Sequence, residues 1–445
     1  MARSFTEALD AQPVRPFQWM IAAVCMLVLV CDGVDLQLLG IVAPLVIESF
    51  GTDPSTFGIA AGAALVGFGL GSFAGGVLGD AIGRRWTLAI SALVFSLSTV
   101  GAASAGDVTQ MALWRLAGGL GFGGAYANAL ALAGEWLPER WRGVTVSTLS
   151  VGTPIGGTIV GLVGPGMAAD YGWDGTFLRI GLATTLMVVL IVVALRDSPA
   201  FLLALGKREQ AQKNARFVLD TDEELAPERH EADGVEGQRT SVFDRRNLRL
   251  NIGIGLAFTA AAMVAYSILT WTTTMLTARG FTLADAGGAV ALAGVTSMIG
   301  SVLVGLAMRR FGSHRVLTTI SVVLTCVLVA LAVQVEALPA EPSAMQQQVV
   351  TWLVGAAGGF FSAAIAGMYV LMTFGYPQSC RSSGIGFGIF MSRIGAIGGS
   401  ALGGALLELG GASTWPFFAI LVVCAIVISA ASLVINRHVP PLSRS

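Results

Sequence analysis

Long apolar stretches limit what this chain can fold into more than any other feature of its sequence. A helix that crosses about 30 Å of hydrocarbon needs about 20 mostly apolar residues. Twelve stretches have that character: residues 17–40, 57–79, 86–105, 110–136, 143–167, 177–195, 251–276, 286–308, 315–336, 347–373, 384–408 and 414–436. Their length and lack of alternation predict helices and not barrel strands. We therefore expect an all-α membrane protein with twelve transmembrane helices.

The composition also indicates a lipid-embedded chain. Only 12% of the 445 residues are charged, about half of the ~25% found in ordinary globular proteins. The net charge of −1 gives no indication of nucleic-acid binding. The five cysteines form no CxxC pair, and no metal cluster, phosphate loop or nucleophile–histidine pairing is visible. We expect neither an enzyme nor a bound cofactor.

Basic residues lie mainly in every second loop. Arg84, Arg140 and Arg309 lie in loops of one set, whereas the opposite loops carry little beyond Arg279. The positive-inside rule therefore places both termini in the cytoplasm. The chain divides into an N-terminal six-helix half (1–195), a cytoplasmic linker (196–250) and a C-terminal six-helix half (251–445). The linker, rich in both signs of charge, is expected to be a partly helical, flexible tether.

An internal repeat relates the two halves. Residues 76–85, after the second stretch, align with residues 305–312, after the eighth, at an offset of 229. Glycines of the fifth and eleventh stretches repeat at an offset of 242. Two six-helix repeats around a site at the membrane midplane are typical of secondary transporters.

Four ionisable residues lie well inside the stretches, namely Asp32, Asp35, Arg115 and Arg393. A charge at mid-membrane costs at least ~2.5–3.5 kcal/mol and usually marks a function. Asp32 and Asp35 are three residues apart and share a helix face, so they are candidates for proton coupling. Arg115 keeps its proton and must pair with Asp32, Asp35 or a bound anion. The alternative is a purely structural pair that joins two helices.

Arg393 is the candidate ligand for a substrate anion. Its guanidinium can hold a carboxylate through two parallel hydrogen bonds, and no acid in the C-terminal stretches is placed to neutralise it. The alternative is a pair with a backbone carbonyl or with an aspartate of the first half. Further candidates for the substrate site are aromatic or amide residues that could instead bridge helices. They are Tyr126, Asn128, Tyr266, Tyr369 and Phe390.

A second group of candidates lies at the cytoplasmic side. Asp80, Gly83 and Arg84 follow the second stretch and could latch neighbouring helices until the transporter opens inward. The alternative is that these arginines only set the topology. Glu135 ends the fourth stretch, where it has either a gating or an interfacial role.

Together these motifs resemble the major facilitator superfamily over the whole chain. The resemblance rests on residues 76–85, on the arginine–glycine pattern of residues 115–123, and on Asp-Ser-Pro-Ala-Phe-Leu at 197–202. Within the superfamily, Asp32-Gly33-Val34-Asp35 in the first stretch is similar to the first helix of the aromatic acid/proton symporters. Residues 128–135 and 392–395 also fit that family.

The resemblance implies proton-driven uptake of an aromatic carboxylate, such as a benzoate, across a bacterial inner membrane. It implies proton coupling at Asp32 and Asp35, a cytoplasmic latch at Asp80 and Arg84, and charge transfer and anion binding at Arg115 and Arg393. Arg309 departs from the family pattern, because the second-half repeat usually has aspartate there.

The predicted partners are therefore an organic anion, protons and the lipid bilayer, and the predicted state is a monomer. Alternatives are a superfamily carrier for another organic anion, such as an aliphatic dicarboxylate, or a drug exporter. An alternative of another class is a membrane sensor that transports nothing.

Overall fold

The computed structural model describes residues 4–219, 225, 242–377 and 380–441, and these residues are organised as helices joined by short loops. The helices of the N-terminal half are α2 (Pro16–Phe50), α3 (Pro54–Ile82), α4 (Arg84–Ala102), α5 (Val108–Trp136), α6 (Glu139–Leu149) and α7 (Gly152–Ala194). Those of the C-terminal half are α10 (Leu248–Thr277), α11 (Leu283–Phe311), α12 (Ser313–Glu336), α13 (Ala344–Gly375), α14 (Arg381–Gly410) and α15 (Trp415–Val434). The short elements are α1 (Phe5–Asp10), α8 (Pro199–Ala204), α9 (Arg208–Ala215) and the 3₁₀ turn η2 (Arg245–Asn247).

Eleven helices in the described part of the chain are long and apolar enough to cross a membrane. One of them, α7, contains a kink at Gly172, whose φ of 72° lies outside the helical range. The first part of α7 packs on α2 through Gly156, and the second packs on α4 through Gly181. Because α7 is divided at the kink, it counts as two membrane-spanning segments. The total is then twelve, which confirms the predicted number of transmembrane segments.

The predicted fifth span is not one continuous helix. It was expected over residues 143–167, but α6 ends at Leu149 and α7 begins at Gly152. Pro154 explains the break, because a proline has no N–H for the carbonyl four residues earlier, here that of Ser150, and its ring clashes with that carbonyl. The first span is in turn longer than predicted, since α2 continues past residue 40 to Phe50.

Glycines bring the helices of each half close together. Within α3 and α5, a Cβ at Gly67 would lie 2.2 Å from the carbonyl oxygen of Leu116, and one at Gly119 would lie 2.0 Å from that of Ala64. In the other half, a Cβ at Gly300 of α11 would lie 2.2 Å from the carbonyl oxygen of Gly359 in α13. Small residues at such contacts let helix backbones approach within a membrane.

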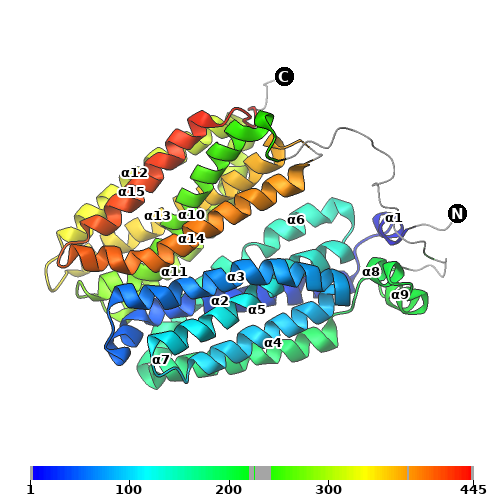
Figure 1. Ribbon diagram of the computed structural model, residues 1–445, viewed down its shortest axis with the longest axis horizontal. Helices are drawn as coiled ribbons and strands as arrows, with labels where there is room; N and C mark the ends of the chain where they lie inside the picture. The colour runs from blue at the N-terminus through cyan, green and yellow to red at the C-terminus, as the bar shows by residue number, and fades with distance from the viewer. Residues whose placement is uncertain (1–3, 220–224, 226–241, 378–379, 442–445) are drawn as a thin grey trace.

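The two halves touch each other away from the end of the bundle at which α8 and α9 lie, which we call the linker end. Figure 1 shows the halves in contact at one end and diverging toward the linker end. The Gln37 amide donates to the Leu269 carbonyl at 2.7 Å, and Thr273 donates to that of Gly40. At the far end of α3, a Cβ at Gly58 would lie 2.3 Å from the Ala401 carbonyl oxygen of α14.

The first part of the linker packs against the N-terminal half instead of forming a free tether. Leu202, Ala211 and Val218 are buried in one hydrophobic cluster with Phe5 and Trp136. Residues 199–219 thus contain the helical part expected of the tether, but their apolar side chains pack on the N-terminal half. The acidic runs at 220–224 and 228–236 lie outside the described residues.

Candidate functional site

Asp35 and Arg115 form a buried ion pair between α2 and α5. Arg115 Nη1 lies 2.5 Å from Asp35 Oδ2, and the two side chains are 2% and 0% exposed. Arg115 Nη2 also donates to the Asp35 carbonyl at 3.2 Å. Thr99 of α4 donates to the other carboxylate oxygen of Asp35 at 2.5 Å. Of the partners that the sequence allowed for Arg115, the structure selects Asp35.

Asp32 is also buried but has far fewer partners. Its Oδ2 accepts one long hydrogen bond of 3.5 Å from Thr153 of α7, and its Oδ1 has no hydrogen-bond partner among the described residues. Gly33 makes this approach of α7 possible, because a Cβ there would lie 2.1 Å from the Thr153 carbonyl oxygen. A buried carboxyl group that lacks partners is suited to binding a proton, since protonation removes the charge that the site leaves uncompensated.

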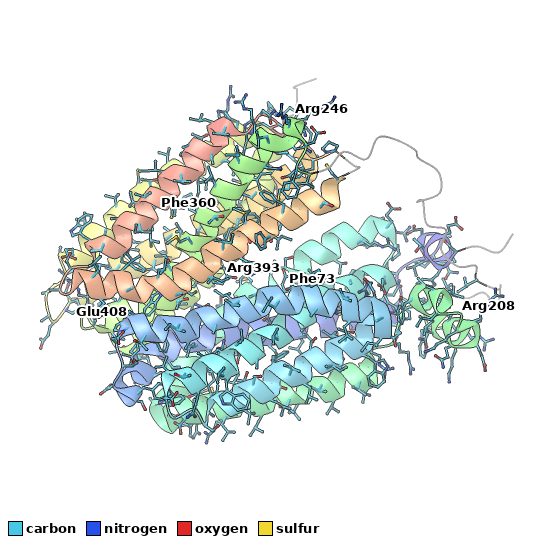
Figure 2. All side chains as sticks on the ribbon, in the orientation of Figure 1. Phe73, Arg208, Arg246, Phe360, Arg393 and Glu408 are labelled. Atoms are coloured by element: carbon cyan, nitrogen blue, oxygen red, sulfur yellow. The ribbon has the colours of Figure 1, made fainter. Side chains whose placement is uncertain are left out.

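Arg393 lies where the two halves meet in the middle of the bundle (Figure 2). Its Cζ is 4.0 Å from the ring centroid of Phe68, which belongs to α3 of the other half. Within the described part of the chain it makes no ion pair. The guanidinium therefore makes no direct contact with a carboxylate there, although Asp32 of the first half lies near enough to attract it.

Three tyrosines gather around Arg393 and Asp32. Tyr126 lies 5.8 Å from Phe68, ring to ring, and hydrogen-bonds Ser150. Tyr126 and Tyr369 both lie within electrostatic range of Arg393 and of Tyr266. We call Asp32, Tyr126, Tyr266, Tyr369 and Arg393 the central cluster. It combines a cation, a carboxyl group and aromatic faces from both halves.

Two of the predicted substrate residues, Asn128 and Phe390, make no hydrogen bond or ring contact with the central cluster among the described residues. Asn128 donates both amide hydrogens to backbone carbonyls, those of Gly75 and Gly124, at 2.8 Å each. It therefore links α3 to α5. This link lies beside Gly79, where a Cβ would contact both Asn128 and Arg84. Phe390 is 64% exposed and stacks on no other ring among the described residues.

A small cavity separates the Asp35–Arg115 pair from the C-terminal half. Its volume is about 20 Å³, which is room for one water molecule. Arg115, Gln37, Tyr266, Thr270 and Ser400 line it. Arg115 Nε has no hydrogen-bond partner in the part of the chain that the structure describes, so a water here would satisfy a buried donor.

The candidate latch residues form a network at the linker end. Arg84 Nη2 lies 2.5 Å from Asp80 Oδ1, and Arg84 Nε lies 3.1 Å from Glu135 Oε1. Ser198, at the start of α8, donates to the other oxygen of Glu135 at 2.6 Å. These contacts join α3, α4, α5 and α8, so Glu135 is a member of the network.

Gly83 forms the tight turn between α3 and α4. Its φ of 100° lies in the region that only glycine adopts readily, and a Cβ would lie 2.5 Å from Asp197 Oδ1. Asp197 accepts a hydrogen bond of 3.3 Å from the Arg85 backbone N–H. Burial nevertheless raises the pKa of the Asp197 carboxyl group, because the hydrogen bond offsets desolvation only in part.

Several contacts of the site have no signal in the sequence. Thr99, Thr153 and Ser198 are hydroxyl residues like many others in membrane helices, and Phe68 is one of 22 phenylalanines. Their partners lie between 58 and 325 positions away in the chain, and only the packing of the helices brings them together. Thr153, next to the Pro154 break, is the exception, since a helix break in a span is typical of transporter sites.

Comparison with known proteins agrees with this architecture. A profile described as Major Facilitator Superfamily matches residues 25–337, well over half of the chain. The chain belongs to the major facilitator superfamily, and it is a multi-pass membrane transporter and not an enzyme.

Relatives of known function cover nearly the whole chain. The 4-hydroxybenzoate transporter PcaK of Acinetobacter baylyi is 28% identical and aligns with 96% of this chain and 94% of its own length. The gallate transporter of Pseudomonas putida is 27% identical, with 90% and 88% covered. The solved xylose transporter XylE from E. coli has a TM-score of 0.72 at 17% identity, with 94% and 97% covered.

Proposed function

We propose that the protein takes up an aromatic carboxylate together with protons across a bacterial inner membrane, as a monomer with both termini in the cytoplasm. One observation carries the proposal. Arg393 lies between the halves with its guanidinium face on Phe68 and without a carboxylate partner in the described chain. A substrate carboxylate would bind the free edge through two hydrogen bonds, while the tyrosines of the central cluster contact its ring.

The relatives support this substrate class. The names of those described above specify 4-hydroxybenzoate and gallate, and a further relative of similar coverage is a benzoate transport protein. Each of these molecules is a carboxylate on an aromatic ring. An aliphatic dicarboxylate would use the arginine but would leave the tyrosines without an aromatic partner.

Proton coupling is assigned to the two aspartates. Asp32 takes the proton, because its Oδ1 has no partner and it lies near Arg393. Protonation frees Arg393 from the attraction of Asp32, so that the substrate anion becomes its counter-ion. Asp35 and Arg115 hold α2 and α5 together and adjust as Asp32 changes charge. The energy is adequate, since one charge moving across 100 mV is worth about 2.3 kcal/mol.

The arrangement of the halves supports transport by alternating access. Their contacts lie away from the linker end, so the state described opens the central cluster toward that end, which we take as cytoplasmic. In the opposite state those contacts open, and the latch of Asp80, Arg84 and Glu135 helps to close the linker end. More than one proton must accompany a monovalent anion for positive charge to move inward.

Uptake into proteoliposomes tests the proposal. Wild-type protein should accumulate 4-hydroxybenzoate or protocatechuate under an inward proton gradient and lose accumulation when an uncoupler is added. Arg393→Gln should lower uptake at least about 30-fold, since removing a buried charge partner costs about 2 kcal/mol or more. Arg249→Gln, an exposed arginine near the linker end of α10, is the matched control.

Asp32→Asn separates coupling from binding. The variant should still exchange substrate across the membrane but should no longer accumulate it against a gradient. Full accumulation in this variant, or accumulation in wild type without a proton gradient, would contradict the coupling. Preference for succinate over benzoates would contradict the substrate class. A strain that lacks this protein would distinguish a sensor. If that strain still took up the compound but no longer responded to it, the protein would be a sensor and not the transporter.

A further inference from the structure

The second copy of the loop repeat has lost the acids that neutralise the first. At the offset of 229, Arg309 occupies the position of Asp80, and Arg315 occupies that of Trp86. In the first copy, Asp80 and Glu135 neutralise Arg84. In the second, neither Arg309 nor Arg315 has an ion-pair partner within the described residues.

The whole linker end of the C-terminal half is strongly basic. Among described residues from 242 onward, Asp244 is the one acid at this end, because the others lie at the opposite end of the bundle. They are Asp285, Glu336 and Glu408 near helix ends and Glu341 in the loop between α12 and α13. Arg309, Arg310 and Arg315 are exposed there. An unneutralised cluster of cations at the membrane–water boundary attracts an anion.

An apolar groove of about 620 Å³ begins beside these arginines. It lies between α11 and α12 with α13 as its floor, and Leu303, Val304, Ile320 and Phe360 line it. Phe360 lies in the C-terminal half away from Arg393 (Figure 2), so the groove is separate from the central cluster. Thr296 also lines it, but its hydroxyl already donates to the Gly355 carbonyl at 2.6 Å.

The groove is apolar and is long enough to hold an acyl chain across one leaflet of a bilayer. Its lining on α11 runs from Thr296 to Phe311, which is about 22 Å at 1.5 Å per residue. One leaflet contributes about 15 Å, half of the ~30 Å hydrocarbon thickness. Arg315 lines the groove at its linker end, and Arg310 stacks on Phe311 at 5.4 Å. The lining thus joins an acyl-length apolar surface to a phosphate-binding charge.

We propose that this groove binds an anionic phospholipid of the cytoplasmic leaflet. One acyl chain lies along α11 and α12 over Phe360, and the headgroup phosphate binds Arg315 with support from Arg309 and Arg310. Basic pockets between transmembrane helices are known to hold such headgroups. The cation at position 315 selects anionic over zwitterionic lipid, and the groove selects a lipid over a free phosphate.

Native mass spectrometry of the purified full-length protein tests the proposal with defined lipids. Wild type should retain phosphatidylglycerol at least about five-fold better than phosphatidylcholine, and glycerol phosphate should not bind. Arg315→Gln should lower phosphatidylglycerol retention about five-fold. Arg249→Gln, which lies at the same end but does not line the groove, should leave it unchanged.

A second variant tests the groove without touching the charges. Ala307 lines the groove and is partly exposed, so Ala307→Trp fills it and should reduce retention of both lipids. Equal retention of the two lipids by wild type would overturn the proposal. Equal losses of phosphatidylglycerol in Arg315→Gln and Arg249→Gln would also overturn it, as would binding of glycerol phosphate on its own. If Ala307→Trp released a second copy of the protein and not a lipid, the groove would be a protein interface.

Discussion

Asp32 and Asp35 are one helical turn apart on α2, yet their surroundings make them chemically different. Asp35 has Arg115 and Thr99 as partners, whereas Asp32 has one long hydrogen bond and a free oxygen. The sequence shows only that both carboxyl groups share a face. Which one is neutralised depends on α4 and α5, which the spacing of the aspartates does not reveal.

This difference predicts unequal effects on stability. Asp35→Ala leaves the Arg115 guanidinium buried without a counter-ion, so it should lower the free energy of unfolding by about 3–5 kcal/mol. Asp32→Ala removes only one weak hydrogen bond and should cost less than about 1 kcal/mol. Denaturant unfolding of the purified protein in detergent measures both. Similar losses in the two variants would show that Asp32 has partners of its own.

Asp197 predicts a pH dependence at the linker end. Burial raises its pKa in the folded protein, while the unfolded carboxyl group keeps its ordinary, lower value. Between these two values the folded state binds more protons, so this residue lowers stability as the pH rises through the interval. Asp197→Asn keeps an oxygen to accept from the Arg85 N–H.

The measurement for Asp197 is the melting temperature of both proteins from pH 4 to pH 7. The wild type should lose stability relative to Asp197→Asn as the pH rises. Parallel curves would mean that the carboxyl group titrates alike in the folded and unfolded chains.

At the scale of elements, the turn between α3 and α4 is the position least able to accept a side chain. Gly83→Ala meets both an unfavourable φ and the Asp197 carboxylate, so it should destabilise the protein by about 1–3 kcal/mol. Gly76→Ala is the matched control. It lies in α3 with no atom within 4 Å of a new Cβ, and should stabilise by about 0.5–1 kcal/mol. Thermal melting distinguishes the two, and equal shifts would refute the steric argument.

The helices were largely predictable from the sequence because hydrocarbon thickness fixes their length. The positions of Arg115 and Arg393 were likewise readable, since a charge stands out in an apolar stretch. The break between α6 and α7 does not follow from hydropathy, because a proline removes a backbone N–H without making the stretch less apolar. Pro154 itself is the signal for the break. Asn128 was expected in the substrate site, but nothing in its own stretch shows that it faces Gly75 of α3.

At the scale of the whole molecule, the contacts between α3 and α14 predict a site for locking the transporter. A Cβ at Gly62 would lie 3.0 Å from that of Ala401, so a separation of the two helices by about 0.5–1 Å would bring the pair to the spacing of a disulfide. In a background without native cysteines, Gly62→Cys with Ala401→Cys should form a disulfide that abolishes uptake until a reductant is added.

The matched control for this disulfide stays within one half. A Cβ at Gly124 of α5 would lie 3.4 Å from that of Ser91 in α4. Gly124→Cys with Ser91→Cys should therefore crosslink without blocking uptake. Full uptake by the oxidised Gly62–Ala401 pair would show that the halves need not separate there.

The stacking of Arg393 on Phe68 has a thermodynamic consequence. The cation belongs to one half of the protein, whereas Phe68, Tyr126 and the Asp32 carboxyl group belong to the other. An anion bound there contacts both halves, and separating them changes the free energy of those contacts. A ligand shifts a conformational equilibrium by its difference in affinity for the two states. Substrate therefore acts on the opening of the protein as an effector as well as a cargo, and external substrate should accelerate efflux of internal substrate.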